Sequence, residues 1–430
     1  MSECTIAEFP DHVDEVVTIK GWVQNRRSSG KISFLIIRDG SGICQAVVTR
    51  NDTGDMYQEI RKLPLESSVI VRGKVIKEDR APGGYEVQVE SVEIVSKADE
   101  FPIGKKEHGP DFLLSNRHLW IRSPRQIAIL KIRDTLVRHV RAYFAENGFT
   151  LVDTPIFTTT YGEDSTNLFS VDYFDLGKTY LTQTGQLYLE AAIFALGKVY
   201  CLGPTFRAEK SKTRRHLTEF WMAEAEVAFC DHKKNLEIQE DFVSYIVQNT
   251  ISDRDKELRV LGRDTSQLEK VKPPFYRISY DEAIELLKKK GHDTKWGEDL
   301  GGDEETLIAN SFDKPVFIEN YPRKIKAFYM KQHPERKDCA LCADLLAPEG
   351  YGEIIGGSQR EDDIDILLRS MEEHNLDPTR YAWYIDLRRY GSVPHSGFGL
   401  GIERTLSWIC GLHHVRETIP FPRMLYRAYP

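Results

Sequence analysis

The sequence contains no apolar run near the ~18 residues that a membrane-spanning helix needs, so we expect no membrane protein. Cysteine is scarce: seven residues, an odd number scattered over 430 positions, indicate a reducing compartment rather than a disulfide framework. Residues 1–10 have neither a basic stretch nor an apolar core, which argues against a signal peptide. We therefore expect a cytoplasmic protein, and the length favours two or three domains.

An excess of basic charge is also lacking. Lys and Arg total 58 and Asp and Glu total 66, a formal net charge of −8, which argues against a general nucleic-acid-coating protein. Any contact with a nucleic acid must come from local basic patches. Residues 204–216 form one, with five Lys or Arg residues against the single acid Glu209. Alone, such a patch is more often a solvated loop than a binding site.

Residues 1–97 carry the pattern of a small barrel. Period-2 apolar runs, separated by Gly, Asp and Pro, predict five strands, and Asp55–Lys62 is compatible with a helix after the third. Five strands in this order favour a Greek-key barrel of the OB type, which binds single-stranded oligonucleotides. Phe34 could stack on a base, although the local pattern by itself favours a core aromatic. The expected strands are residues 17–22, 32–38, 43–48, 69–76 and 85–94.

After a polar segment at 98–117, which reads as a linker, the period changes and residues 118–430 form a second domain. Apolar residues at spacings of three and four over 129–143 predict an amphipathic helix, which Asn147-Gly148 would end. Residues 149–152 then read as a strand. Strands and helices are mixed from there to the end, so we expect an α+β chain.

Three constellations carry the chemistry. In the first, two apolar runs flank the basic patch and predict a hairpin with Arg207 and Glu209 on one strand and Phe220 on the other, suited to a phosphate and a base. In the second, residues 397–401 place glycine at every second position, so a flat ring could lie against the backbone before Arg404. The third pairs Asp344 with residues 353–360, where two carboxylates could share Mg²⁺ with phosphates.

With these residues in view, the chain resembles the class II aminoacyl-tRNA synthetases of the aspartate, asparagine and lysine subgroup. The resemblance covers nearly the whole chain, and the three class motifs occur in order. It implies an N-terminal five-stranded OB-fold barrel that binds the anticodon, followed by a catalytic domain with a six-stranded antiparallel sheet flanked by helices. It also implies ATP and Mg²⁺ as cofactors, tRNA as partner, and a homodimer formed through the first motif.

The resemblance assigns roles at the nucleotide site. Arg207 would hold the α-phosphate and the amino-acid carboxylate, and Glu209 would meet the adenine amino group. Phe220 and Arg404 would stack on opposite faces of adenine, with Arg404 also touching the γ-phosphate. The implied catalytic residues are Arg207, Arg404 and Glu353. Further ATP contacts would come from Arg215, His216, Glu353, Gly399 and Gly401.

Two other sites follow from the resemblance. Asp344 and Glu353 match magnesium-bridging acids, whereas Gly356 stands where some relatives have a metal-binding serine. In the barrel, the residues that match the holders of the anticodon's middle uridine are Arg27, Phe34 and Gln45.

The amino acid is the finer question. Aspartate-specific relatives place a lysine where this chain has Leu189, and Glu224 could accept the amide N–H of asparagine while repelling a carboxylate. Arg360 could donate to the amide oxygen, and Gln186 and Leu189 complete the expected amino-acid pocket. We therefore expect asparagine. The alternatives are an aspartate-specific enzyme, an idle synthetase-like RNA-binding or signalling protein, and an asparagine synthetase on the same fold, against which the barrel counts.

Overall fold

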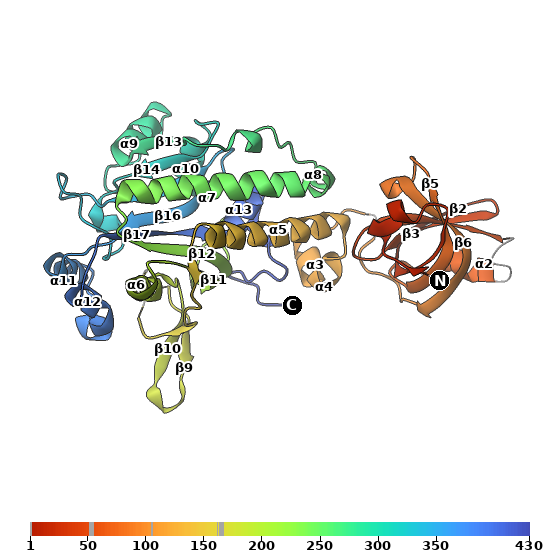
Figure 1. Cartoon of the computed structure of the whole chain (residues 1–430), viewed down its shortest axis with the longest axis horizontal. Coiled ribbons are helices and arrows are strands. Elements are labelled where there is room, and N and C mark those ends of the chain that lie inside the picture. The colour runs from red at the N-terminus through yellow and green to blue at the C-terminus, as the bar shows by residue number, and fades with distance from the viewer. Residues whose placement is uncertain (1, 51–55, 105, 161, 163–166) are drawn as a thin grey trace. The chain divides into compact units, whose positions relative to one another are not determined.

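The computed structural model describes residues 2–50, 56–104, 106–160, 162 and 167–430 (Figure 1). The chain folds into two compact units, Met1–Pro110 and Asp111–Pro430. Residues 111–117, which the sequence assigned to a linker, belong to the second unit. There the fully buried Arg117 donates to the carbonyl oxygens of Ile419 and Pro420 at 2.9 and 2.8 Å. No helix among the described residues is long and apolar enough to cross a bilayer.

The first unit is the expected barrel. Five long strands close through the pairing of β2 with β5, and a two-residue strand, β1, adds to β2. The elements are β1 (Ser2–Glu3), β2 (Val16–Ser29), β3 (Ile32–Arg38), β4 (Ile43–Thr49), α2 (Tyr57–Lys62), β5 (Ser68–Lys77) and β6 (Tyr85–Ser96). The expected helix is therefore α2, and its expected first residue, Asp55, lies outside the described residues.

Successive residues along the barrel strands point alternately into the core and to the outer face. On β3, Leu35 and Ile37 are fully buried inside, whereas Phe34 is half-buried on the outer face. Phe34 is therefore not a core aromatic. Two glycines allow strands to cross closely: a Cβ at Gly21 would lie 2.4 Å from the carbonyl oxygen of Arg38, and one at Gly73 would lie 2.2 Å from that of Gln88.

The second unit is built on an eight-stranded sheet in the order β13-β14-β15-β16-β17-β12-β11-β7. Its strands are β7 (Thr150–Leu151), β11 (Lys198–Phe206), β12 (Glu219–Ala228), β13 (Tyr276–Ser279), β14 (Val316–Glu319), β15 (Cys342–Ala347), β16 (Gly352–Gln359) and β17 (His395–Gly401). A separate small sheet contains β8 (Phe157–Thr158), β9 (Ser170–Asp172) and β10 (Lys178–Leu181).

The sheet is larger than the six strands expected. The six central strands, from β14 to β11, are all antiparallel, as the resemblance implied. One short strand at each edge, β13 and β7, pairs in parallel and makes the whole sheet mixed. Edge strands of two and four residues carry little pattern of their own, so the sequence did not indicate β13.

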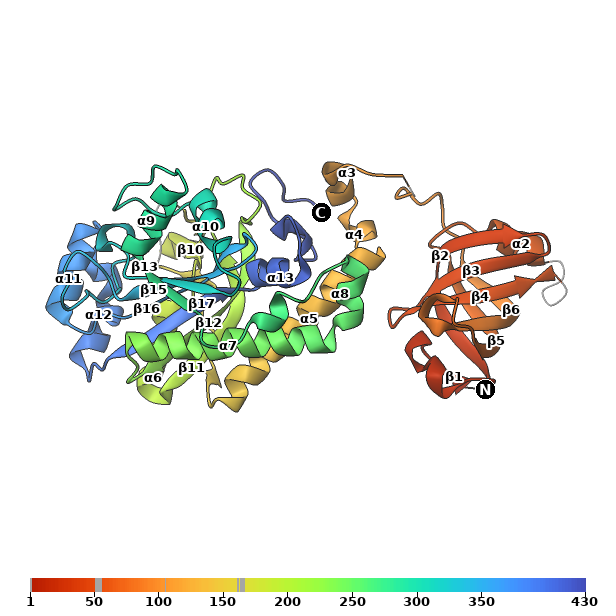
Figure 2. The ribbon, with the colours of Figure 1, turned by 90° about the horizontal axis from the view of Figure 1, so that it is seen from above.

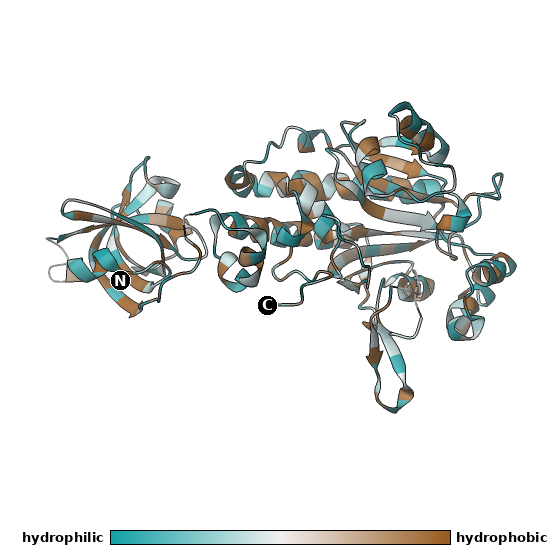
Figure 3. Cartoon of the chain, turned by 180° about the vertical axis from the view of Figure 1, so that it is seen from behind, coloured by the Kyte–Doolittle hydropathy of each residue, from teal (hydrophilic) through white to brown (hydrophobic). Residues whose placement is uncertain are grey.

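Helices cover the sheet and border its cavity. Figures 1 and 2 show α5 and α7 lying together along one face, where Leu136, Phe242 and Phe398 belong to one core. Brown and teal segments alternate along the helices of this unit (Figure 3), as expected where one side of a helix is apolar. The helices are α3 (Pro110–Ser115), α4 (Arg117–Trp120), α5 (Pro124–Glu146), α6 (Gln186–Leu196), α7 (His232–Asp253), α8 (Asp255–Leu261), α9 (Tyr280–Lys289), α10 (Gly302–Ala309), α11 (Ile364–Glu373), α12 (Ala382–Arg389) and α13 (Ile402–Cys410).

Local sequence explains the bounds of α5. The Ser123 hydroxyl caps its first turn by accepting from the backbone N–H of Gln126, and Pro124 occupies the first helical position. Beyond Asn147, Gly148 has a φ of +75°, a left-handed conformation that favours glycine and ends the helix. The chain then enters the edge strand β7.

Candidate active site

One cavity of about 310 Å³ lies over the central strands of the catalytic sheet. It receives side chains from β12, β15, β16, β17, α6 and α13 and from the loop between β11 and β12. Of the residues that the sequence indicated for ATP, metal and amino acid, all but one line it: Gln186, Arg207, Glu209, Arg215, His216, Phe220, Glu224, Asp344, Glu353, Arg360, Gly399, Gly401 and Arg404.

The floor of this cavity is a row of four residues in register. Asp344 on β15 pairs with Gly356 on β16, Gly356 with Gly399 on β17, and Gly399 with Glu224 on β12. Neighbouring strands lie ~4.8 Å apart, so about 14 Å separates the two acidic positions. The two glycines between them leave the sheet bare, which provides a flat surface on which a planar ligand can rest.

The hairpin of β11 and β12 supplies the first cation. The backbone N–H of Arg207 donates to the carbonyl oxygen of Thr218 at 3.1 Å, which fixes the arginine just beyond the ladder. Its guanidinium carbon lies 5.5 Å from the centre of the Phe220 ring. Burial and the nearby charge of Arg404 lower the pKa of His216, whose Nε2 is 3.4 Å from the Glu209 carboxylate.

Arg404 supplies the second cation from the first turns of α13. Its Nη1 donates to the Glu353 carboxylate at 2.9 Å and to the Glu353 carbonyl oxygen at 3.2 Å. Burial would raise the pKa of Glu353, but Arg404, Lys326 and Arg207 outweigh it and hold that pKa below its usual range. Two arginines from distant stretches of the chain therefore act on one carboxylate.

The paired acids suit a hard cation. Lys326 donates to Asp344 Oδ2 at 2.7 Å, and Arg404 engages Glu353 Oε2. The other oxygens converge on Gly356, because a Cβ placed there would lie 3.1 Å from Glu353 Oε1 and 3.6 Å from Asp344 Oδ1. This pair of oxygens fits Mg²⁺, with water and phosphate completing its shell. The sequence pattern did not indicate Lys326 as part of this site.

Three polar partners hold the Arg215 side chain in place. It donates to the Glu305 carboxylate at 2.9 Å, to the Thr306 hydroxyl at 2.5 Å and to the Gly350 carbonyl oxygen at 2.7 Å. Burial and the nearby Glu353 raise the pKa of Glu305 to about 7. Glu305 belongs to α10, and nothing in the local sequence pattern distinguished it from the neighbouring acids.

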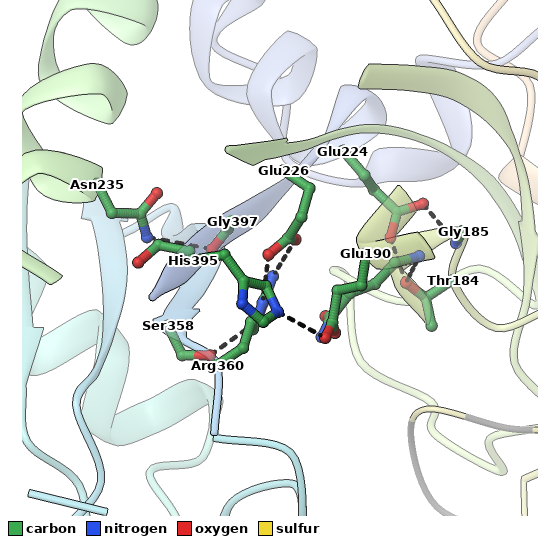
Figure 4. Close-up of polar contacts among 12 residues, drawn as sticks. Thr184, Gly185, Glu190, Glu224, Glu226, Asn235, Ser358, Arg360, His395 and Gly397 are labelled. Atoms are coloured by element: carbon green, nitrogen blue, oxygen red, sulfur yellow. Dashed lines mark hydrogen bonds and ion pairs between the residues drawn. The ribbon is translucent and has the colours of Figure 1, made fainter. Parts of the chain in front are cut away.

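The opposite end of the cavity is lined by groups suited to an amino acid (Figure 4). Glu224 accepts from the Thr184 hydroxyl and, at 2.8 Å, from the backbone N–H of Gly185. Arg360 makes a two-pronged ion pair with Glu226 at 2.9 and 2.8 Å and donates to the Ser358 hydroxyl at 2.7 Å. An acceptor and a donor thus face the same space.

Leu189 is the residue that does not line the cavity. Gln186 and Glu190 lie one turn apart on α6, and Leu189 lies between them in the chain. The Leu189 side chain is fully buried in an apolar cluster with Ile193, Val199 and Cys201. The expected contact between Leu189 and the substrate is therefore wrong, because this side chain packs in the core and does not line the cavity.

The three barrel residues meet on the outer face of the first unit. The Arg27 guanidinium lies 4.6 Å from the centre of the Phe34 ring and donates to Gln45 Oε1 at 3.0 Å. The Gln45 amide in turn donates to Glu86 at 3.0 Å. An aromatic ring flanked by a cation and an amide offers stacking and hydrogen bonding to a nucleotide base.

Comparison with known proteins assigns each of the two units to a family. Residues 109–425 match the family described as tRNA synthetases class II (D, K and N), and residues 17–95 match the OB-fold nucleic acid binding domain. The asparagine--tRNA ligase of Symbiobacterium thermophilum is 55% identical over 100% of both chains.

Two solved structures resemble the whole chain. An asparaginyl-tRNA synthetase from Pyrococcus horikoshii, complexed with asparaginyl-adenylate, has a TM-score of 0.97 and 49% identity, with 100% of each chain covered. The Entamoeba histolytica asparaginyl-tRNA synthetase with the same ligand has a TM-score of 0.91 and 32% identity over 100% of each chain. This chain therefore belongs to the class II tRNA synthetases of the aspartate, lysine and asparagine group.

Proposed function

We propose that the chain is an asparagine–tRNA ligase. It activates asparagine with ATP, forming asparaginyl-adenylate and pyrophosphate, and then transfers asparagine to the 3′ end of its tRNA. The observation that carries the choice of amino acid is the placement of Glu224 and Arg360 at one end of the cavity. The names and full-length similarity of the relatives support the same reading.

Hydrogen-bonding capacity explains the choice. A carboxylate offers about four acceptor sites, so Glu224 can accept a substrate amide N–H besides its contacts with Thr184 and Gly185. Arg360 directs three N–H groups to Glu226 and Ser358, and its remaining donors suit the amide oxygen. Aspartate would bring a second negative charge against Glu224, and polar sites of this kind can discriminate by ~10⁴.

Activation needs positioning and charge stabilisation rather than a side-chain nucleophile. The substrate carboxylate attacks the α-phosphorus in line as pyrophosphate leaves. Arg207 holds the α-phosphate, and Arg404 and Phe220 enclose the adenine over the bare floor at Gly399 and Gly401. The two guanidinium groups stabilise negative charge that grows on the phosphate oxygens.

Glu353 and Asp344 are the residues that would hold Mg²⁺, which supplies positive charge to the phosphates when bound. Lys326 and Arg404 keep the two carboxylates in place. His216 and Arg215 serve the outer phosphates, with Glu305 holding Arg215 in position.

The remaining assignments concern partners. Arg27, Phe34 and Gln45 bind the anticodon of the tRNA. The protein works in the cytoplasm as a homodimer, and the exposed Leu151, Ile156 and Phe157, in and after the edge strand β7, support an interface there. Light scattering on the purified chain should give twice the monomer mass.

Pyrophosphate exchange into ATP tests the function. Exchange should require asparagine and should not respond to aspartate at equal concentration. A response to aspartate alone would instead assign an aspartate-specific enzyme, and release of free asparagine from aspartate, ATP and ammonia would assign an asparagine synthetase. Glu224→Gln is the matched variant. It removes the negative charge of this side chain but keeps its shape, so it should reduce the preference for asparagine over aspartate.

A further inference from the structure

Glu190 lies behind the amino-acid end of the cavity, one helical turn after Gln186 on α6. It is fully buried, and its carboxylate accepts from the Gln186 amide at 3.1 Å and from Arg388 at 2.8 Å. The Tyr384 hydroxyl lies 2.8 Å from the same carboxylate. Figure 4 shows Glu190 beside His395, whose Nε2 is 3.0 Å away.

Cationic and polar neighbours favour the ionised form of Glu190. Burial would raise the pKa of the Glu190 carboxyl, but Arg388 and His395 outweigh it and hold that pKa below its usual range. His395 Nδ1 lies 2.8 Å from the carbonyl oxygen of Val393, so the imidazole bridges this carbonyl and the Glu190 carboxylate.

This cluster is not a metal site. The ligand atoms of Glu190, Glu226 and His395 all lie within 4.8 Å of one another, a spacing that an ion could use. However, Arg388 already pairs with Glu190, and Arg360 pairs with Glu226. Two buried ion pairs therefore lie behind the amino-acid end, Arg388 with Glu190 and Arg360 with Glu226.

We propose that Glu190 is a positioning residue for amino-acid selection. An amide has one donating and one accepting end, and the Glu190 carboxylate takes the donating end of Gln186. The carbonyl oxygen of Gln186, a residue that lines the cavity, is thereby turned toward the substrate and accepts from its ammonium group. The charge of Glu190 also offsets the buried charge of Arg388, which would otherwise favour a negatively charged substrate side chain. This inference rests on the proposed activation of asparagine.

Removing the negative charge of Glu190 should therefore alter the selection of asparagine over aspartate as well as the binding of asparagine. In Glu190→Gln, the new amide keeps its oxygen toward Arg388 and His395 and offers its NH₂ to Gln186, which must turn its own NH₂ toward the substrate. The surroundings become one charge more positive, which favours aspartate. We expect the ratio of kcat/KM for asparagine to that for aspartate, measured by pyrophosphate exchange, to fall about 10- to 100-fold.

Two further variants separate selection from packing. Glu190→Asp keeps the charge but shortens the reach to Gln186, so KM for asparagine should rise while the preference over aspartate changes less than in Glu190→Gln. Tyr384→Phe removes a hydroxyl from the same buried cluster without changing its charge, and it should lower Tm with a selectivity ratio close to that of the wild type.

The outcomes distinguish the two proposals. A wild-type protein that does not respond to asparagine would overturn the proposed function itself. If the wild type responds, an equal loss for both amino acids in Glu190→Gln, or a selectivity change in Tyr384→Phe as large as that in Glu190→Gln, assigns Glu190 to packing alone and overturns the inference. Should Glu190→Gln fail to fold, an unchanged KM for asparagine in Glu190→Asp would overturn it as well.

Discussion

Asp344 and Glu224 stand at opposite ends of one row across the catalytic sheet, with Gly356 and Gly399 between them. The Asp344 end carries the paired acids and their cations, and the Glu224 end carries the groups proposed to contact the amino acid. In the proposed function, the reacting phosphate would lie over the bare stretch between them. Selection of the amino acid and handling of the phosphates are thus separated along the row.

A side chain added to the bare stretch between Asp344 and Glu224 should block ligand binding. A Cβ at Gly399 would lie 2.4 Å from Met222 Cε and 3.5 Å from Glu224 Cγ. We expect Gly399→Val to lower kcat/KM in pyrophosphate exchange by about 100-fold, the scale of a 1 Å misplacement of the reacting groups. Gly203→Val on β11 is the control, since a Cβ there meets no atom within 4 Å. Equal effects of both variants would refute the role of the floor.

The planar guanidinium group of Arg404 should contribute to activity in addition to its positive charge. Arg404→Lys retains a cation but loses the planar set of donors that meets both Glu353 and phosphate. The exchange rate should fall by about 10² to 10³. Arg263→Lys, at the ion pair with Glu349 outside the cavity, should leave the rate close to that of the wild type. A wild-type rate of pyrophosphate exchange in Arg404→Lys would contradict the role assigned to Arg404.

Leu189 should affect stability rather than substrate binding. Leu189→Ala removes apolar contacts from a fully buried site, so the free energy of unfolding should fall by about 2–5 kcal/mol. KM for asparagine should stay within about twofold, because the side chain does not line the cavity. Urea unfolding and pyrophosphate exchange measure the two quantities. A large rise in KM with no loss of stability would place Leu189 in the pocket after all.

The barrel should contribute only to the tRNA step. Phe34→Ala removes the ring on which a base could stack, so KM for tRNA in aminoacylation should rise about 10- to 100-fold. Pyrophosphate exchange without tRNA should be unchanged. Val95→Ala, an exposed apolar truncation on β6, is the control and should change neither quantity. Loss of exchange in Phe34→Ala would show that the barrel is not acting through tRNA alone.

His414 should make stability depend on pH. Burial, together with Arg416 and His413, lowers the pKa of His414 to about 4, and Glu417 opposes this shift only weakly. Between about pH 6.5 and 4 the unfolded chain therefore binds a proton that the folded chain does not, so the free energy of unfolding falls as pH falls. His414→Asn should lose less stability between pH 7 and pH 5 in urea unfolding. Identical losses in variant and wild type would contradict this assignment.

Local patterns in the sequence located the barrel strands and the active-site hairpin, although β2 runs on to Ser29 and β11 ends at Phe206, before Arg207 and Glu209. The expected strand at residues 32–38 coincides with β3, because period-2 alternation and the turn at 39–42 depend on near neighbours. The motif residues Arg207 and Arg404 were also identifiable, since each lies in a short stretch with a distinctive composition. The resemblance to the family then predicted that these distant stretches of the chain form one site.

Contacts between distant segments required the fold. Lys326 meets Asp344, Glu305 meets Arg215, and Glu190 meets His395 across 205 positions. Nothing near these acids and bases in the chain distinguishes them from solvated charges. Burial at the meeting point of several elements gives them their partners, and packing decides that Gln186 lines the cavity whereas Leu189 lies in the core. Such properties belong to the packing of the whole unit, so no local window of residues contains them.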